Sequence, residues 1–568
     1  MANQAPPSAS QPLVEHDVAV PVRDGIQLRV DVYRPPGPGP FPVLFAASPY
    51  GKRFVHLPAT PVFRFRETGH IEWFVERGYA YVLLDVRGTG SSRQGTWAVL
   101  DQHEQNDLYD VIEWIADQPW STGKVGMIGE SYFGASQWLA AAAQPPHLAC
   151  IAPYDAFVDP YREAVYHGGI ACVGFASWWS FDTRARTLLD QPTMMPDDGM
   201  SFDLIAAMMR HPTEDEFWLE RSAERKFHLI RTPFFSIGNW KMVGLHTRGN
   251  LLAFEQINAP KKLLMNAGAD GGNGTDDSQR IFDSLEFHEI LLRFYDHWLK
   301  GVDNGVMDEP AVQYVVQGKE GLETADTWPL PDTTVERYYL APGPAEATDS
   351  INDGALETEA PPAGTPPTTV SYPDPAWSGW PGLGTGVFGT AGLPNSVKRI
   401  LTFSSPELDE DLEVVGPIEL RLFLSSDQTD TDVLVRLSDQ PPMNVVKSFV
   451  TTSLADVGQP ARVVTRGWLK ASHRALDPHK SKLLRPWHTH RDPKPLVPGQ
   501  VYELAIELWP TAWLFKKGHR IRLELSQGDS PIFDAPFNHH YGTKMGTDTI
   551  HHEQPFPSVL LLPVRKKK

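Results

Sequence analysis

Cysteine and long apolar runs are scarce in this 568-residue sequence. It contains two cysteines, Cys150 and Cys172, too few for the disulfide framework of a small secreted domain, and isolated cysteines are usually buried as small hydrophobic residues. No apolar run reaches the roughly 18 residues of a membrane span, and the N-terminal residues lack the basic and apolar segments of a signal peptide. We therefore expect a soluble protein in a reducing, cytoplasmic setting.

Basic charge is also in short supply. The formal net charge is −19, and the only basic cluster is the terminal run 565–568. Nucleic acids and anionic membranes both require a basic binding surface, so we expect neither as a partner. The composition leaves a homo-oligomer possible.

The residues that are present favour a large α/β protein. Hydrophobic residues make up 41% of the chain, enough for two or three domain cores at this length. Short, solidly apolar strands alternate with segments of helical spacing, which predicts a parallel sheet with right-handed crossovers. The strands are expected at 41–47, 80–85, 124–128, 234–237 and 262–265, and the helices at 72–78, 102–118, 132–143 and 281–299.

Changes in this alternation of strands and helices predict the domain organisation. We expect an α/β core over 14–152 that continues over 231–311, because the strand–helix alternation resumes there. The intervening residues 153–230 are rich in Trp, Met and Phe and show no convincing strand pair, which predicts an inserted helical cap. Strand-like, period-two alternation dominates later, so residues 313–568 are expected to form a C-terminal β-sandwich domain.

The most informative motif is the serine within Val125–Gly134. A buried strand leads into Gly129-Glu130-Ser131, and a helix follows at once. This pattern is typical of the nucleophile elbow of an α/β-hydrolase, in which a tight turn exposes the serine hydroxyl and directs the backbone N–H of Tyr132 at a developing oxyanion. We therefore expect the core over 14–152 and 231–311 to be an α/β-hydrolase core. The alternative is an ordinary strand-to-helix turn that happens to contain a serine.

A second oxyanion donor is expected from the loop Ser48-Pro49-Tyr50-Gly51. This loop directly follows a predicted strand, at the place where a hydrolase of this fold supplies its other donor. A tyrosine hydroxyl can donate to an oxyanion. Tyr50 is therefore a candidate donor, and the alternative role is simple packing.

These residues resemble the family of cocaine esterase, α-amino-acid ester hydrolases and X-Pro dipeptidyl peptidases. The resemblance implies a serine nucleophile, a tyrosine-assisted oxyanion hole, a helical cap over the site, and ester or amide substrates. It also implies that the C-terminal β-sandwich is a jelly roll. It runs along most of the chain and rests on the elbow together with 49–52, 85–92, 144–146, 467–469, 472–474 and 515–520.

The chain departs from the family pattern at the base and the acid. In the relatives the acid follows the strand after the cap; here that stretch contains Trp240, a candidate substrate contact, and places Met242 at the acid position. The relatives carry the histidine in the next loop, where this chain has Asp270. No histidine lies between His246 and His288.

Three hypotheses follow from this departure. In the first, the members are exchanged, so that His246 is the base and Asp270 orients it; both follow strands that end at the same sheet edge. In the second, His167 of the cap acts on Ser131. In the third, the triad has degenerated, and the pocket performs acyl transfer, a cyclisation or a lyase step, or only binds a ligand. For His246 and His167 alike, the alternative is a structural role.

We predict a serine hydrolase that cleaves an ester or amide of a small organic molecule through a Ser131 acyl-enzyme, with no cofactor. The histidine pairs His488/His490 and His539/His540 invite a metal assignment, but neither has cysteines or carboxylates at the spacing of zinc ligands. We therefore expect no metal.

Overall fold

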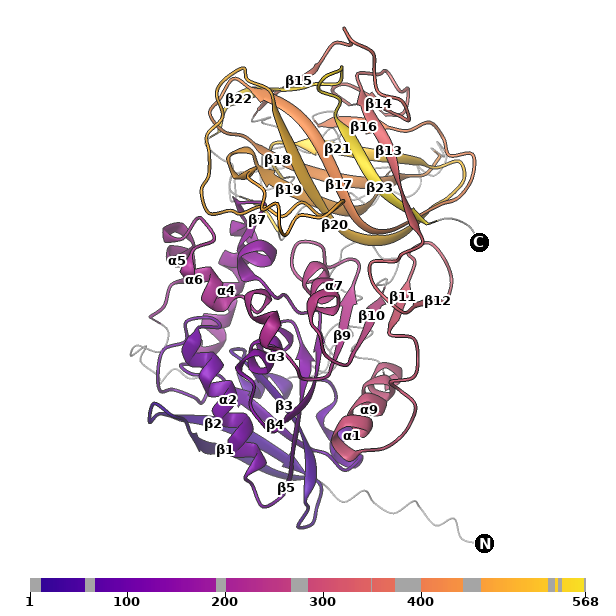
Figure 1. Cartoon of the computed structure of the whole chain (residues 1–568). Coiled ribbons are helices and arrows are strands. Elements are labelled where there is room, and N and C mark those ends of the chain that lie inside the picture. The colour runs from indigo at the N-terminus through magenta and orange to yellow at the C-terminus, as the bar shows by residue number, and fades with distance from the viewer. Residues whose placement is uncertain are drawn as a thin grey trace, which may run out of the picture.

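A computed structural model provides the architecture of the chain (Figure 1). It describes residues 12–56, 67–189, 201–266, 285–348, 350–372, 400–442, 461–529, 537–539 and 544–565.

The N-terminal half is built on a ten-stranded mixed sheet. Its central strands, from β4 through β11, run parallel to one another, and antiparallel strands flank them at both edges. The order across the sheet is β1 (Leu13–Pro21), β2 (Gln27–Arg34), β4 (Ala80–Asp85), β3 (Phe41–Ser48), β5 (Ser121–Glu130), β6 (Leu148–Tyr154), β9 (Phe234–Asn239), β10 (Lys261–Asn266), β11 (Val312–Val315) and β12 (Leu322–Ala325).

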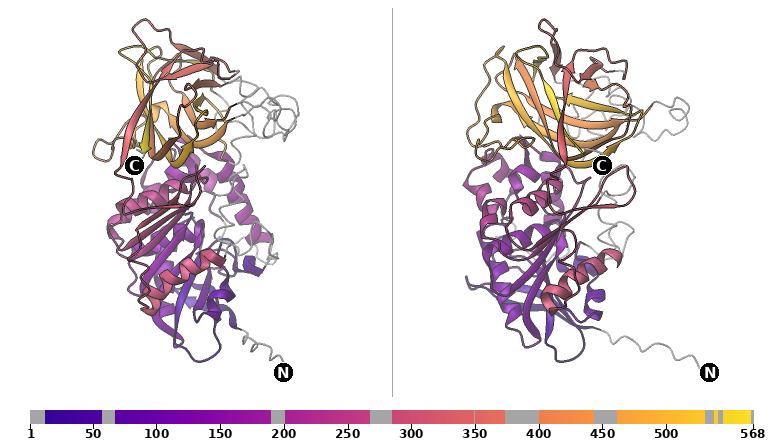
Figure 2. Two further views of the ribbon diagram at one scale, coloured as in Figure 1. Left: turned by 90° about the vertical axis from the view of Figure 1, so that its right-hand side faces the viewer. Right: turned by 45° about the vertical axis from the view of Figure 1, so that its right-hand side comes forward.

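Helices cover both faces of this sheet (Figures 1 and 2). They shield the central strands from water, which is why those strands read as continuous apolar runs rather than as alternating ones. On one face lie α2 (Gln102–Ala116), α3 (Tyr132–Ala143) and α7 (Thr247–Gln256), and on the other lie α1 (Ile71–Glu76) and α9 (Leu285–Lys300). The predicted start of the last helix at Ile281 lies outside the described residues.

The segment between β6 and β9, where the sequence analysis expects a cap, is mainly helical. It also contains a short hairpin of β7 (Tyr166–His167) and β8 (Ile170–Ala171) that the sequence did not predict. Its helical turns are a π-helix (Tyr161–Val165), α4 (Val173–Leu189), α5 (Leu204–Arg210), α6 (Glu216–Arg221) and a 3-10 helix (Glu224–Leu229).

Two strands that the sequence analysis placed in the C-terminal domain belong to the first sheet. Val312–Val315 pairs parallel with β10, and Leu322–Ala325 pairs with it in turn. The domain start expected at residue 313 is therefore too early for these strands. Short strands carry no signal of which sheet they join, so the sequence could not assign them.

The C-terminal domain is a sheet in which β17 also pairs with β23, so that most of its strands close into a ring. The alternating segments predicted at 419–424, 432–437 and 520–525 lie within β17, β18 and β21. The jelly-roll assignment itself stays a prediction. The order is β15 (Thr368–Tyr372), β22 (Gly546–Ile550), β17 (Leu412–Ser426), β20 (Tyr502–Phe515), β19 (Arg462–Lys470), β18 (Asp432–Gln440), β21 (Arg520–Ser526), β16 (Leu401–Ser404), β14 (Gly354–Glu357), β13 (Thr333–Ala341) and β23 (Val559–Arg565).

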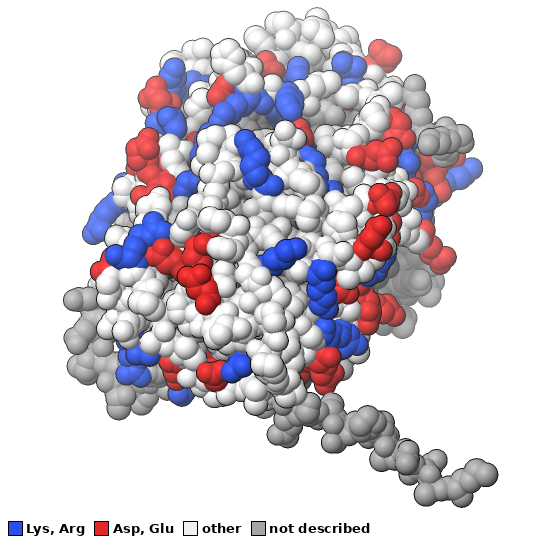
Figure 3. Space-filling model, turned by 60° about the horizontal axis from the view of Figure 1, so that its bottom comes forward, with Lys and Arg blue, Asp and Glu red and all other residues white. Residues whose placement is uncertain are grey.

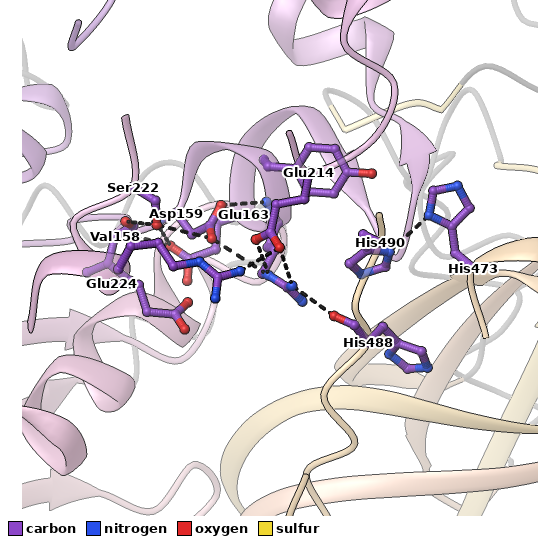
Figure 4. A network of polar contacts seen from close by, with 12 residues as sticks. Val158, Asp159, Glu163, Glu214, Ser222, Glu224, His473, His488 and His490 are labelled. Atoms are coloured by element: carbon purple, nitrogen blue, oxygen red, sulfur yellow. Dashed lines mark hydrogen bonds and ion pairs between the residues drawn. The ribbon is translucent and has the colours of Figure 1, made fainter. Parts of the chain in front are cut away.

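A buried ion network joins the cap to the C-terminal domain (Figure 4). The Arg162 guanidinium donates to both carboxylate oxygens of Glu214, at 3.1 Å each, and to the carbonyl of His488 at 2.8 Å. Arg248 pairs with Glu163 at 3.0 Å and with Glu507 at 3.5 Å. Removing one partner of such a pair leaves a buried charge uncompensated, so the network fixes the cap against the second domain.

Charged side chains of both signs are distributed over the described surface (Figure 3). Acidic and basic side chains are interspersed on the face shown in Figure 3, with large uncharged areas between them. Within the described residues, no helix combines the length and apolar character needed to cross a bilayer. Both cysteines are free and buried.

Candidate active site

The serine of the predicted elbow lies on a strained turn between β5 and α3. Ser131 has φ 59° and ψ −116°, a conformation that L-residues rarely adopt. Its N–H donates to the Tyr154 carbonyl on the neighbouring strand at 3.0 Å. A Cβ at Gly129 (φ 134°) would lie 2.4 Å from the Cβ of Phe133, so only glycine fits there. These contacts hold the hydroxyl clear of the sheet, at the C-terminal edge of the strands.

His246 lies beside this hydroxyl. It follows β9 at the start of α7, and its Nε2 is 3.4 Å from Oγ of Ser131. Its ring stacks parallel to Phe157, and burial lowers the pKa of His246 to about 3, so the ring is neutral. A neutral imidazole can accept the serine proton. Nδ1 is buried and makes no hydrogen bond with any described residue.

Tyr50 also lies within hydrogen-bond reach of the Ser131 side chain. Its hydroxyl accepts a hydrogen bond from Nε1 of Trp179 at 3.1 Å, which connects it to cap helix α4. Burial raises the pKa of Tyr50, while hydrogen bonds with Trp179 and Ser131 partly oppose that rise. The phenol therefore keeps its proton at neutral pH and can donate it to an oxyanion. Of the predicted cap aromatics, Trp179 faces this site, whereas Trp178 is 58% exposed.

The side chain of Tyr132 is held away from the reacting hydroxyl. Its phenol donates to both oxygens of Glu104 at 2.9 Å and accepts from Trp97 at 3.2 Å. Burial raises the pKa of Glu104 to about 8. The sequence analysis did not single out Glu104. It anchors the first residue of α3, whose backbone N–H is the predicted second oxyanion donor.

Asp155 is a further residue at the C-terminal edge of the sheet that the sequence analysis missed. It directly follows β6, is fully buried and has φ 38°, so the residues after β5 and β6 are both in the rare positive-φ region. Neither carboxyl oxygen makes a hydrogen bond of good geometry with any described residue, although the backbone N–H of Asn239 lies near enough to lower the pKa of Asp155. Burial has the larger effect and raises the pKa of Asp155 well above its usual value. Backbone strain and an unpaired buried carboxyl together are typical of functional sites.

Two predicted site residues lie elsewhere. Both ring nitrogens of His167 are engaged, Nδ1 with Nε2 of His539 at 2.8 Å and Nε2 with the Glu163 carbonyl at 3.1 Å. It therefore contacts the domain boundary and not Ser131, and we do not retain it as a candidate base. The Trp240 indole donates to the Val315 carbonyl at 2.8 Å and is buried, so it supports the sheet edge rather than facing the serine. Asp270 lies outside the described residues.

Comparisons with known proteins agree with this architecture. The family model described as X-Pro dipeptidyl-peptidase (S15 family) matches residues 24–269, and that of the X-Pro dipeptidyl-peptidase C-terminal non-catalytic domain matches residues 304–561. Cocaine esterase of Rhodococcus sp. is 28% identical over 610 residues, which cover 98% of this chain and 99% of the esterase.

Solved structures show the same arrangement along the whole chain. A CocE/NonD family hydrolase from Staphylococcus aureus is 27% identical and superposes with a TM-score of 0.78, covering 97% of this chain and 94% of that one. An α-amino acid ester hydrolase, 19% identical, has a TM-score of 0.70 over 100% of this chain and 98% of its own, and supports the fold alone. With both family models matched in order and the α/β-hydrolase fold in place, the chain belongs to the X-Pro dipeptidyl-peptidase (S15) family and is a serine hydrolase.

Proposed function

We propose that the protein hydrolyses an ester or amide of a small organic molecule through an acyl-enzyme on Ser131, with His246 as the general base. The observation that carries this proposal is the 3.4 Å contact between Ser131 Oγ and His246 Nε2 on a strained elbow. A serine is a weak nucleophile until a base takes its proton. With a base beside the serine, hydrolysis is favoured over the non-hydrolytic alternatives.

The reaction follows from this geometry. Oγ of Ser131 attacks the carbonyl carbon while its proton moves to Nε2 of His246. The oxyanion that forms accepts hydrogen bonds from the Tyr50 hydroxyl and the Tyr132 N–H. His246 then returns the proton to the leaving alkoxide or amine. A water molecule repeats the sequence on the acyl-enzyme and releases the acid.

The third member of the proposed catalytic triad is the acid that orients His246. The sequence proposes Asp270; among the described residues, the candidate is Asp155, which follows the adjacent strand and whose carboxyl is unpaired. The unpaired Nδ1 of His246 requires an acceptor, because an acceptor there fixes the tautomer that leaves Nε2 free to take a proton. We assign this role to Asp155 ahead of Asp270.

Covalent labelling tests the nucleophile. We expect a serine-directed aryl phosphonate to add once to the wild-type protein, on the peptide that contains Ser131, as measured by mass spectrometry. The Ser131→Ala variant should remain unlabelled. Ser136→Ala is the matched control, because this serine is buried in α3 and should leave labelling intact. An adduct on Ser131→Ala, or none on the wild type, would contradict the proposal.

A second prediction tests the oxyanion hole. Tyr50→Phe removes only the hydroxyl, and we expect kcat to fall by about 10²- to 10³-fold with little change in KM, because the donor acts mainly in the transition state. Tyr132→Phe is the control, since its phenol bonds Glu104 and only its backbone N–H faces the oxyanion. That variant should lose far less kcat and melt at a lower temperature. Equal losses in the two variants would exclude Tyr50 as the donor.

A further inference from the structure

Three potential metal ligands from two distant parts of the chain converge where the cap contacts the C-terminal domain. His167 lies in the β7–β8 hairpin, Cys172 directly follows that hairpin, and His539 comes from the C-terminal domain. One ligand atom of each lies within 4.8 Å of the others, and all three residues are buried. Folding brings His539 to the other two ligands, which lie close together in the sequence, so the spacing along the sequence did not reveal the cluster.

The hydrogen bonds of the outer ring nitrogens determine which atoms face the centre. Nε2 of His167 lies 3.1 Å from the Glu163 carbonyl, and Nδ1 of His539 lies 3.0 Å from a carboxylate oxygen of Asp529. Both partners only accept hydrogen bonds, so each of these nitrogens carries a hydrogen. When each ring carries only this one hydrogen, the inner nitrogens, His167 Nδ1 and His539 Nε2, present lone pairs to each other at 2.8 Å.

Two facing lone pairs repel unless a cation lies between them. The cation is either a proton shared by the two rings or a metal ion. The Cys172 sulfur as a third donor favours a metal, because imidazole and thiolate together suit Zn²⁺. Bonds of about 2.0–2.1 Å to a tetrahedral ion would place the nitrogens about 3.3 Å apart, so the rings need to separate by only about half an ångström.

The surroundings match those of a metal centre. Imidazole ligands usually donate their outer N–H to a carboxylate or a backbone carbonyl, and both arrangements occur here. The His167 ring stacks on Trp468 with centroids 4.6 Å apart, and the N–H of Gly174 donates to the Asn538 carbonyl at 3.0 Å. These contacts hold the cysteine segment against the histidine segment. A divalent ion with one thiolate and the Asp529 carboxylate would also leave this buried centre without net charge.

We propose that His167, Cys172 and His539 bind one Zn²⁺ ion, which cross-links the cap to the C-terminal domain. Three protein ligands leave one position of a tetrahedral ion for a further donor. This site is separate from the hydrolytic one, and it differs from the sequence expectation that the protein holds no metal.

Metal binding by the full-length protein tests this proposal. The protein is stripped with a chelator and titrated with Zn²⁺ and, separately, with Co²⁺. We expect one tight Zn²⁺ per chain, a melting temperature several degrees higher with zinc, and a thiolate-to-Co²⁺ charge-transfer band. Cys172→Ser should lose the band and weaken zinc binding by at least about 100-fold. Cys150→Ser, which alters the other buried cysteine, should keep both.

The cobalt band is needed because the chain has twenty histidines, and weak zinc binding elsewhere is expected. His167→Gln provides a second variant should Cys172→Ser fold poorly, and it should weaken zinc binding to a comparable degree. Wild-type protein that binds zinc no better than Cys172→Ser, or that shows no thiolate band with Co²⁺, would overturn the proposal. A shared proton would then be the cation between the two rings.

Discussion

Replacing Ser131 with alanine is expected to lower kcat/KM for a short-chain aryl ester by roughly 10⁵- to 10⁶-fold, and His246→Ala to a similar degree. The two side chains act as one unit, since the serine needs the imidazole to remove its proton and the imidazole has no other role. The double variant should therefore be no slower than either single variant. Initial rates of ester hydrolysis, with melting temperature as a check on folding, measure the three effects.

Two outcomes would contradict this prediction. If Ser131→Ala turned over as fast as the wild type, the serine would not be the nucleophile, and non-hydrolytic chemistry in the same pocket would have to be sought. If kcat/KM fell by less than about tenfold in His246→Ala but by the full expected factor in Ser131→Ala, another group would be the base. Ser136→Ala is the matched control. Its hydroxyl donates within α3 to the Phe133 carbonyl at 3.0 Å, away from the reacting atoms.

The sequence predicted the elbow well because an elbow is a local structure. A buried strand, a glycine two residues before the serine and an immediate helix leave few other geometries. The placement of His246 near Ser131 followed from a rule of topology, since loops that follow parallel strands meet at one edge of the sheet. The 3.4 Å contact agrees with that reasoning.

Features that depend on distant pairs could not be predicted in the same way. Asp155 is a single aspartate after a strand, and nothing in the sequence distinguishes it from a surface residue; its burial and unpaired carboxyl become visible only in the structure. The convergence of Cys172 with His539 has the same cause. His167 and Trp240 were predicted near the substrate because the cap and the sheet edge surround the pocket, but the direction of a side chain depends on its packing partners.

The second prediction concerns the acid that orients the base. Asp155 is linked to the catalytic pair by a closed series of contacts. The Ser131 N–H bonds the carbonyl of the residue before Asp155, at 3.0 Å, and the Asp155 N–H bonds the Ile237 carbonyl at the end of β9, at 2.9 Å. Thr247, the residue after His246, donates its hydroxyl hydrogen to the carbonyl of Asn239 at 2.7 Å. Asn239 is the last residue of β9, two residues after Ile237. The unpaired carboxyl and the unpaired Nδ1 of His246 are thus held at the same edge of the sheet.

A hydrogen bond between these two groups would offset the free-energy cost of burying each of them without a partner. An unpaired carboxyl in a buried site holds its proton, and an unpaired imidazole there resists gaining one. A hydrogen bond from Nδ1–H to the Asp155 carboxylate lowers the pKa of the acid and raises that of the imidazole from the value of about 3 that burial imposes. The carboxylate also stabilises the imidazolium that forms in the transition state.

We therefore expect Asp155→Asn to lower kcat by about 10⁴-fold near neutral pH, with KM little changed. The pH profile provides the sharper readout. The base must be unprotonated, so activity is lost as the pH falls through the pKa of His246. Without the carboxylate this pKa is lower, and the acidic limb of kcat/KM should move to lower pH. Loss of structure alone would reduce activity without moving the limb.

Asp159→Asn is the matched control, since this aspartate is equally buried but interacts with Ser222 at 3.2 Å and with Arg162 in the ion network. It should lower the melting temperature and leave the acidic limb in place. Asp270→Asn should cost less than about tenfold in kcat. The acid would instead be Asp270 if kcat fell steeply in Asp270→Asn and the acidic limb of the pH profile stayed in place in Asp155→Asn. Ser131 and His246 would keep their roles under either outcome, because each depends only on the contact between them.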